Sequence, residues 1–341
     1  MKIIAWLLGV IALLFQMTIQ LSSGAMVDGL TATFHLSATR AGFLAGAYYP
    51  VYCLLQIPAG LLVDRFGAKS VLVVGLTLAA WSMMFFAYAP SFAWAVFARL
   101  LAGVGLSCCF VSLMDLIGYC FKPSQFAVML GLSETLVIAC IIGLEMILPD
   151  AVQILSWQVV SRMLALGLAV LAALIALLMP ELHASEEEGS LSEISIKSLL
   201  KELVCYIKNP VILGYGLLAG GLFGIVTIFE GLWAQPFYMH GWHRTIMQAS
   251  QLNGVLLAGV GLGAPFLGYL GKFQALRPWV SGGFALLVLF CFTVLVRWGS
   301  GLSAPVLQVL LFCLGVGVSS YVLSYMVGTE QAGKRHYGTV N

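Results

Sequence analysis

A short charged turn between two apolar runs constrains this chain more than any other feature. The stretch Gly60–Lys69, GLLVDRFGAK, separates apolar runs at residues 42–62 and 70–88, and each run is long enough to cross a bilayer. Backbone groups without hydrogen-bond partners are costly in hydrocarbon, so the turn must lie at a membrane surface. Basic residues favour the cytoplasmic surface, and Arg65 and Lys69 therefore place the turn there.

The composition supports a membrane protein and argues against other classes. Hydrophobic residues make up 61% of the chain and charged residues 9%, whereas ordinary soluble chains carry about a quarter charged residues. A net charge of +2 gives no indication of a nucleic-acid partner. None of the eight cysteines has metal-ligand spacing, and we expect no disulfide framework. No nucleophile–base pair or metal set can be picked out, so we expect neither an enzyme nor a cofactor.

Ten apolar segments of spanning length predict an all-α, polytopic fold. They lie at residues 4–27, 42–63, 70–88, 92–119, 125–147, 158–179, 210–234, 248–270, 279–297 and 303–327. Residues 181–209 instead alternate glutamates with lysines, which is typical of a polar linker at a membrane surface. We therefore expect an N-terminal bundle of six helices in residues 1–180 and a C-terminal bundle of four in residues 210–341.

The basic residues set the orientation. With the N-terminus inside, the predicted cytoplasmic segments hold Lys2, Arg65, Lys69, Lys122, Lys197, Lys201, Lys208, Lys272, Arg277, Lys334 and Arg335. The opposite side holds Arg40, Arg244 and Arg297, with Arg162 near that border. This bias predicts that both termini and the linker are cytoplasmic.

Two motifs resemble those of the major facilitator superfamily. The first is G-x-L-x-D-R-x-G-x-K between the second and third helices, matched by Gly60, Leu62, Asp64, Arg65, Gly67 and Lys69. The second is R-x-x-x-G-x-G in the fourth helix, matched by Arg99, Gly103 and Gly105. The resemblance implies two halves of six helices and transport by alternating access. Since the chain ends after ten segments, we expect a product truncated after its tenth helix.

The resemblance also implies roles for these motifs. The turn would act as a cytoplasmic latch, because a carboxylate such as Asp64 is stabilised at a helix N-terminus and Arg65 can bind a second carboxylate or helix end. A solvated loop is the alternative. Arg99, inside a span, is expected to face a partner or water. Its alternative is to extend toward the outer surface. Gly103 shares a face with Arg99, which suits close helix packing.

Three further acidic residues are candidates for proton coupling, namely Asp115, Glu134 and Glu230. Glu134 lies near mid-membrane, where a carboxyl group that alternates between dry and wet surroundings can carry a proton. Its alternative is a structural carboxyl bonded to Ser133 or Thr135. Asp115 lies closer to the cytoplasm and fits a structural role better. Glu230 lies near the outer end of its helix.

In the superfamily, helices 1, 4, 7 and 10 line the central cavity, so polar residues there are expected to meet substrate. The candidates, which include a stripe on the second helix, are Gln16, Gln20, Tyr48, Tyr52, Gln56, Tyr321 and Tyr325. Ser22 and Ser23 share the first helix, and Trp233 fits an interfacial anchor better than a ligand. For the Tyr48–Gln56 stripe, helix packing is the alternative.

The fifth helix lacks the Gly-Pro run of drug–proton antiporters, and the opening helices are similar to bacterial importers of small organic solutes. We therefore expect secondary active uptake of a small polar organic solute, such as an amino acid, small peptide or organic anion. Protons are the expected coupling ion, and the expected setting is a monomer in a bacterial inner membrane. The alternatives are an efflux carrier of the same fold and a truncated membrane protein that does not transport.

Overall fold

Every regular element of the described chain is a helix. The computed structural model describes residues 2–122, 125–180 and 208–332. The first group of helices is α1 (Lys2–Phe34), α2 (Ala38–Gly46), α3 (Tyr48–Ala87), α4 (Phe92–Leu106), α5 (Cys108–Cys120), α6 (Phe126–Leu155) and α7 (Trp157–Leu178). The second is α9 (Pro210–Gly224), η3 (Ile225–Trp233), α10 (Ala234–Pro236), η4 (Phe237–Gly241), α11 (Ile246–Leu270), η5 (Gln274–Leu276), α12 (Arg277–Trp298), η6 (Gly299–Gly301), α13 (Ala304–Val318) and α14 (Tyr321–Ala332).

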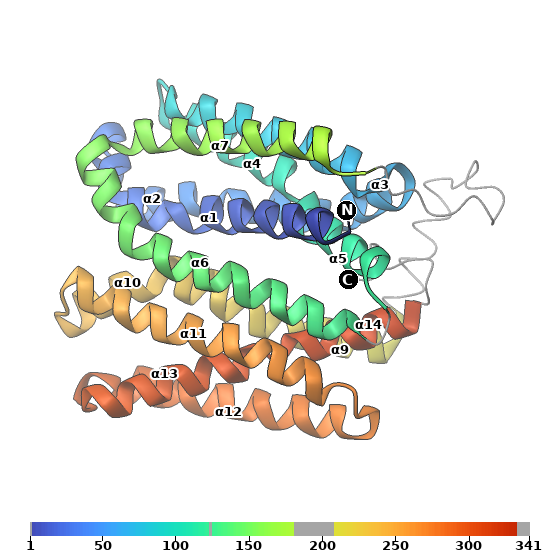
Figure 1. The fold of residues 1–341 in the computed structure, drawn as a ribbon. Coiled ribbons are helices and arrows are strands. Elements are labelled where there is room, and N and C mark those ends of the chain that lie inside the picture. The colour runs from blue at the N-terminus through green and yellow to red at the C-terminus, as the bar shows by residue number, and fades with distance from the viewer. Residues whose placement is uncertain (1, 123–124, 181–207, 333–341) are drawn as a thin grey trace.

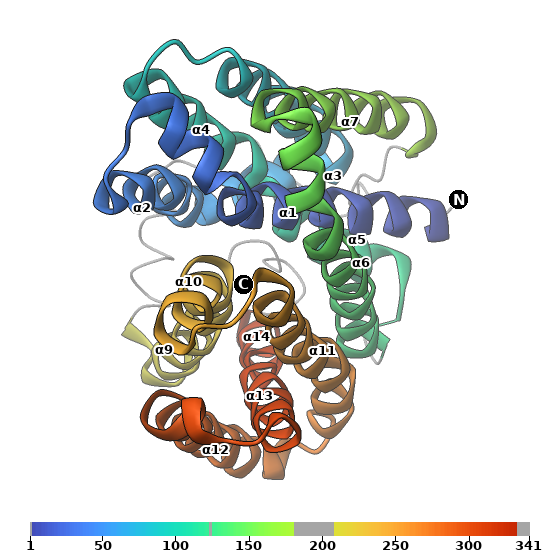
Figure 2. The ribbon, with the colours of Figure 1, turned by 90° about the vertical axis from the view of Figure 1, so that its left-hand side faces the viewer.

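The two groups lie on opposite sides of the molecule, and their helices lie roughly along one long axis (Figure 1). Viewed along that axis, α1–α7 occupy one side and α9–α14 the other, with α6 and α11 packed together at the boundary (Figure 2). The exact domain limits stay a prediction, and the linker predicted at residues 181–209 lies almost wholly outside the described residues.

The ten predicted segments are all helical. Eight helical stretches of the described chain are long and apolar enough to cross a membrane. One of them, Ala38–Ala87, is 50 residues long and folds back on itself, so it supplies two crossings. α6 supplies the remaining crossing, with a shorter apolar centre at Val128–Leu144.

The chain reverses at Gly67. Its φ of 77° and ψ of 152° interrupt α3, and this left-handed φ is one that glycine adopts without steric cost. Tyr48 and Ala79 lie on either side of the reversal and both approach the same turn of α4, at Gly103 and Gly105. The turn predicted from the charged motif is therefore present, and Gly67 is its pivot.

Two helices differ from their predicted form in ways that matter for function. α1 extends to Phe34 rather than ending near residue 27. The polar side chains of Asp28, Thr31 and Thr33 are tolerated there because the end of the helix is in contact with water. The seventh predicted span is π-helical after Gly224, in η3, and the helix continues beyond the predicted end through α10 into a second π-helical segment, η4. Pro236, between the two π-helical segments, has no backbone N–H to donate to the hydrogen-bond ladder. π-Helical turns are rare and occur often at functional sites.

Two hydrophobic cores hold the helices together. One is built from α1–α5 and α7. The other combines residues of α1, α5 and α6 with residues of α9–α14. The second core therefore joins the two groups of helices, and α1 and α5 contribute buried residues to both cores.

Candidate functional site

A cavity of about 490 Å³ lies between the two groups of helices. Its walls come from the second half of α1, from α2, from the second half of α6, from η3 to η4, and from the first turns of α11. The Lys2 end of α1 lies beside Tyr119 at the end of α5, so the cavity occupies the opposite end of the molecule. It is therefore remote from the Gly67 turn.

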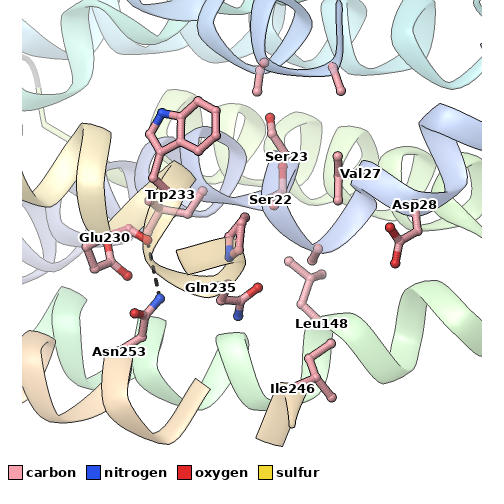
Figure 3. Close-up of a pocket in the computed structure, with 18 of the residues that line it drawn as sticks. Ser22, Ser23, Val27, Asp28, Leu148, Glu230, Trp233, Gln235, Ile246 and Asn253 are labelled. Carbon is pink, nitrogen blue, oxygen red and sulfur yellow. Dashed lines mark hydrogen bonds between the residues drawn. The ribbon is translucent and has the colours of Figure 1, made fainter. Parts of the chain in front are cut away.

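The cavity wall combines apolar surface with polar and charged side chains. Figure 3 shows Ser22, Ser23 and Asp28 from α1 facing Gln235 and Trp233 across the cavity. Asp28 and Trp233 are exposed, whereas Ser22 and Ser23 are buried. The cavity thus leads from exposed side chains at its mouth to buried polar ones at its base.

Glu230 and Asn253 form the polar centre of this wall. Both side chains are buried, at 2% and 1% exposure. The Nδ2 group of Asn253 donates a hydrogen bond of 3.3 Å to the backbone carbonyl oxygen of Glu230 (Figure 3). The Oδ1 atom of Asn253 is buried and accepts no hydrogen bond from the described residues. This contact joins η3 to α11 at the level of the cavity.

Beneath the cavity, the polar residues predicted on the first and second helices meet in a packed layer. The Nε2 group of Gln16 donates a hydrogen bond of 3.1 Å to the Tyr52 hydroxyl, and Gln56 also lies within hydrogen-bonding reach of that hydroxyl. The rings of Tyr48 and Tyr52 stack at 5.3 Å. None of these side chains lines the cavity, so their contact with substrate stays a prediction.

Tyr49, which follows Tyr48 in this layer, ties the two groups of helices together. Its hydroxyl donates a hydrogen bond of 3.2 Å to the backbone carbonyl oxygen of Thr227 in η3. Gln20 is a second hydrogen-bonding partner of Tyr49. The floor of the cavity is therefore a polar contact between α3 and η3.

Glu134 lies deeper in the same layer and contacts the other group of helices. Its buried carboxyl group accepts a hydrogen bond from the hydroxyl of Tyr321 in α14. The ring of Tyr321 packs edge-on against that of Tyr325 at 5.7 Å, and Tyr325 packs against Phe110 of α5 at 5.5 Å. The structure thus brings three predicted site residues together across the boundary.

Ser133 and Thr135, the alternative partners expected for the Glu134 carboxyl group, form their hydrogen bonds with other residues. The Ser133 hydroxyl donates to the Met129 carbonyl oxygen and accepts from the Trp6 indole. The Thr135 hydroxyl bonds to the carbonyl oxygens of Gly131 and Gly261. Both hydroxyl groups are therefore engaged elsewhere, and Tyr321 is the partner found for Glu134.

Arg99 is buried in the α1–α2–α4 interface rather than directed toward the outer surface. Its exposure is 2%. One Nη group donates to the Ile19 carbonyl oxygen at 2.9 Å and the other to the Ala45 carbonyl oxygen at 3.4 Å. Its guanidinium group also lies 5.5 Å from the centre of the Tyr48 ring. These contacts join α1, α2 and α3 to α4, and Arg99 does not line the cavity.

The motif turn at the far end lies beside a pair of acidic residues, Asp64 and Asp115. Asp64 is partly buried, and Asp115 of α5 lies close enough to interact with it electrostatically. Arg65 is exposed and lies over the ring of Phe66 at 5.3 Å. The turn thus places a cluster of charges opposite the cavity, as a surface latch would require.

Comparison with known proteins decides the family. A family model described as Major Facilitator Superfamily matches residues 8–341. The chain belongs to the major facilitator superfamily. The members of this superfamily are multi-pass membrane transporters of the secondary type rather than enzymes.

Relatives and solved structures of this superfamily agree with the fold. The chain is 29% identical over 233 residues to YceJ, an uncharacterized MFS-type transporter of Bacillus subtilis (strain 168), covering 68% of this chain and 57% of YceJ. It is 44% identical over 52 residues to YybO, an uncharacterized transporter of the same organism, covering 15% of this chain and 12% of YybO. The chain thus spans little more than half the length of the longer match.

A bacterial homolog of the human lysosomal transporter Spinster, solved in an inward-facing and unoccupied conformation, matches with a TM-score of 0.68 at 15% identity, covering 99% of this chain and 77% of that one. The same homolog, inward-facing and occupied, gives a TM-score of 0.63 at 14% identity, covering 98% and 76%. At this identity the likeness shows the fold.

Several residues of the cavity in this superfamily member were not predicted as site residues. Asn253 interrupts the apolar run at 248–270, and a polar residue inside a span is a signal that could have found it. Asp28 was missed because the first helix was predicted to end before it. Trp233, predicted as an interfacial anchor, lines the cavity.

Proposed function

We propose that this chain carries a small polar organic solute into the cell together with protons. The observation that carries this proposal is the cavity of about 490 Å³ between the two groups of helices. This volume falls in the range of small-molecule sites, and its base is polar while much of its wall is apolar.

The direction of opening fits one step of an uptake cycle. With the N-terminus in the cytoplasm, the Gly67 turn lies at the inner surface and the cavity, at the opposite end, faces outward. The hydrogen bonds of Tyr49 to Thr227 and of Tyr321 to Glu134 close the path beneath it. A solute entering from outside would reach this closed layer, and breaking these contacts would open the inner side.

The contact of Glu134 with Tyr321 supports proton coupling. Glu134 lies on α6 and Tyr321 on α14, so their hydrogen bond crosses the boundary between the moving halves. Separation of the halves would expose the carboxyl group to water and change its tendency to hold a proton. The conformation and the protonation of Glu134 would then be linked.

The test is uptake by proteoliposomes that contain the purified chain. A panel of amino acids, small peptides and organic acids would be offered with and without an inward proton gradient. We expect one class to accumulate only with the gradient. Accumulation that requires the opposite gradient would favour efflux, and equal levels with and without protein would contradict transport.

A further inference from the structure

We propose that the cavity binds a solute carrying a protonated amine, and that Glu230 holds this group. The inference rests on the proposed function, because it names the class of solute for the same cavity. It selects the amine-bearing solutes, amino acids and peptides included, over organic anions that lack an amine.

The charge of the cavity wall favours a cation. Two lining residues, Asp28 and Glu230, are acidic, and none of the lining residues is lysine or arginine. Arg99 lies behind the wall and its two Nη groups donate to backbone carbonyl oxygens. A carboxylate solute without an amine would therefore meet acidic groups in a setting of reduced dielectric, where repulsion between like charges is strong.

The buried polar atoms on this wall favour a hydrogen-bond donor. The Nδ2 group of Asn253 donates to the Glu230 carbonyl oxygen, so Oδ1 is the other polar atom of this side chain. The opposite amide orientation would set two oxygens against each other. The Oδ1 atom is buried and accepts no hydrogen bond from the described residues. A buried acceptor of this kind is stabilised by a ligand N–H group.

An aromatic ring completes the site. Trp233 lies three residues after Glu230 in the π-helical segment η3 and lines the same cavity (Figure 3). The face of an indole ring attracts ammonium groups. A carboxylate, an amide oxygen and an indole ring therefore lie on one wall, and all three suit an ammonium group.

The charge preference can be measured without knowing the solute. Val27 lines the cavity and is partly exposed, so a Val27→Cys variant places a thiol there. In detergent, its rates of modification by a cationic and an anionic methanethiosulfonate reagent would be followed by peptide mass spectrometry. The reference is Ser303→Cys, an exposed position outside the cavity. We expect the cation-to-anion rate ratio at position 27 to exceed the reference ratio by about tenfold.

Substitutions at Glu230 and at Asp150 then test which carboxylate causes the preference for the cationic reagent. Adding Glu230→Gln should lower the ratio at position 27 by at least about threefold. Adding Asp150→Asn should leave it unchanged, because Asp150 is exposed and does not line the cavity. A ratio at the reference level, or one that survives Glu230→Gln, would overturn the inference.

A second measurement keeps Glu230 in place and so does not depend on the folding of that variant. Three matched sets of compounds would compete with modification of Cys at position 27. They are amino-acid amides, free amino acids and N-acetyl amino acids. We expect protection from the sets with a free amine. Protection by the N-acetyl set alone, or by none, would contradict the inference.

Neither measurement requires transport, so the two proposals can fail separately. A cation-selective cavity without uptake would contradict the proposed function alone. Proton-driven uptake of a carboxylate that lacks an amine would contradict the amine inference alone.

Discussion

Glu134 is the single residue on which the coupling mechanism depends most. Its only hydrogen-bonding partner found among the described side chains, Tyr321, lies on the other group of helices. Glu134→Gln keeps the shape of the side chain and removes its titration. We expect this variant to lose accumulation of solute against a gradient and to retain exchange of solute across the membrane, measured as counterflow in proteoliposomes.

Tyr321→Phe is the matched partner variant, because it removes the hydrogen bond and leaves the carboxyl group. It should change the pH dependence of uptake without abolishing accumulation. If Glu134→Gln still concentrates solute with the parent's pH dependence, Glu134 has a structural role and the protons move elsewhere.

At the level of elements, α4 depends on glycine for its approach to α3. A Cβ atom at Gly105 would lie 2.6 Å from the Gly75 carbonyl oxygen and 2.7 Å from the Ala79 nitrogen. Both are backbone atoms that cannot move aside cheaply, so Gly105→Ala should destabilise the fold by about 1–3 kcal/mol. Thermal unfolding in detergent would show a lower midpoint.

Gly143→Ala is the control for this substitution. It makes the same change in α6, where a Cβ atom would meet nothing within 4 Å. Alanine has the higher helix propensity, so the midpoint should stay or rise. Equal losses at both positions would mean that packing of α4 on α3 does not explain the effect.

The motif turn is the second element with a testable role. Asp64 and Asp115 form an acidic pair beside the Gly67 reversal. Asp64→Asn should leave the protein in the membrane and slow transport by about tenfold, because the charge that stabilises one conformation is lost. Asp150→Asn, at an exposed position remote from the turn, should transport normally. Parent turnover in Asp64→Asn would remove the latch role.

For the whole molecule, orientation is the property on which the direction of the cavity rests. We predict that both termini and the 181–209 linker are cytoplasmic. Cysteine labelling of intact cells with an impermeant reagent would test this: Ser303→Cys should react and Ser190→Cys should not. The reverse pattern would place the cavity on the cytoplasmic side and contradict the predicted topology.

The sequence by itself determined the membrane fold, because that fold follows from local properties. Apolar runs of sufficient length must be helical in a bilayer, since their backbone groups have no other partners. The turn at Gly60–Lys69 followed from its charged residues and from the apolar runs on either side. Gly103 was expected to pack closely because it shares a face with Arg99. These inferences depend only on residues that are close to one another in the sequence.

Only the tertiary structure decided which polar residues meet across the molecule. Glu134 and Tyr321 are far apart in sequence, as are Asn253 and Asp28, and no helical periodicity relates them. The structure places the first pair in a closed layer and the second on the cavity wall. The reason is physical: the packing of α6 and α11 at the boundary between the two groups sets these positions. That packing is a long-range property of the whole chain.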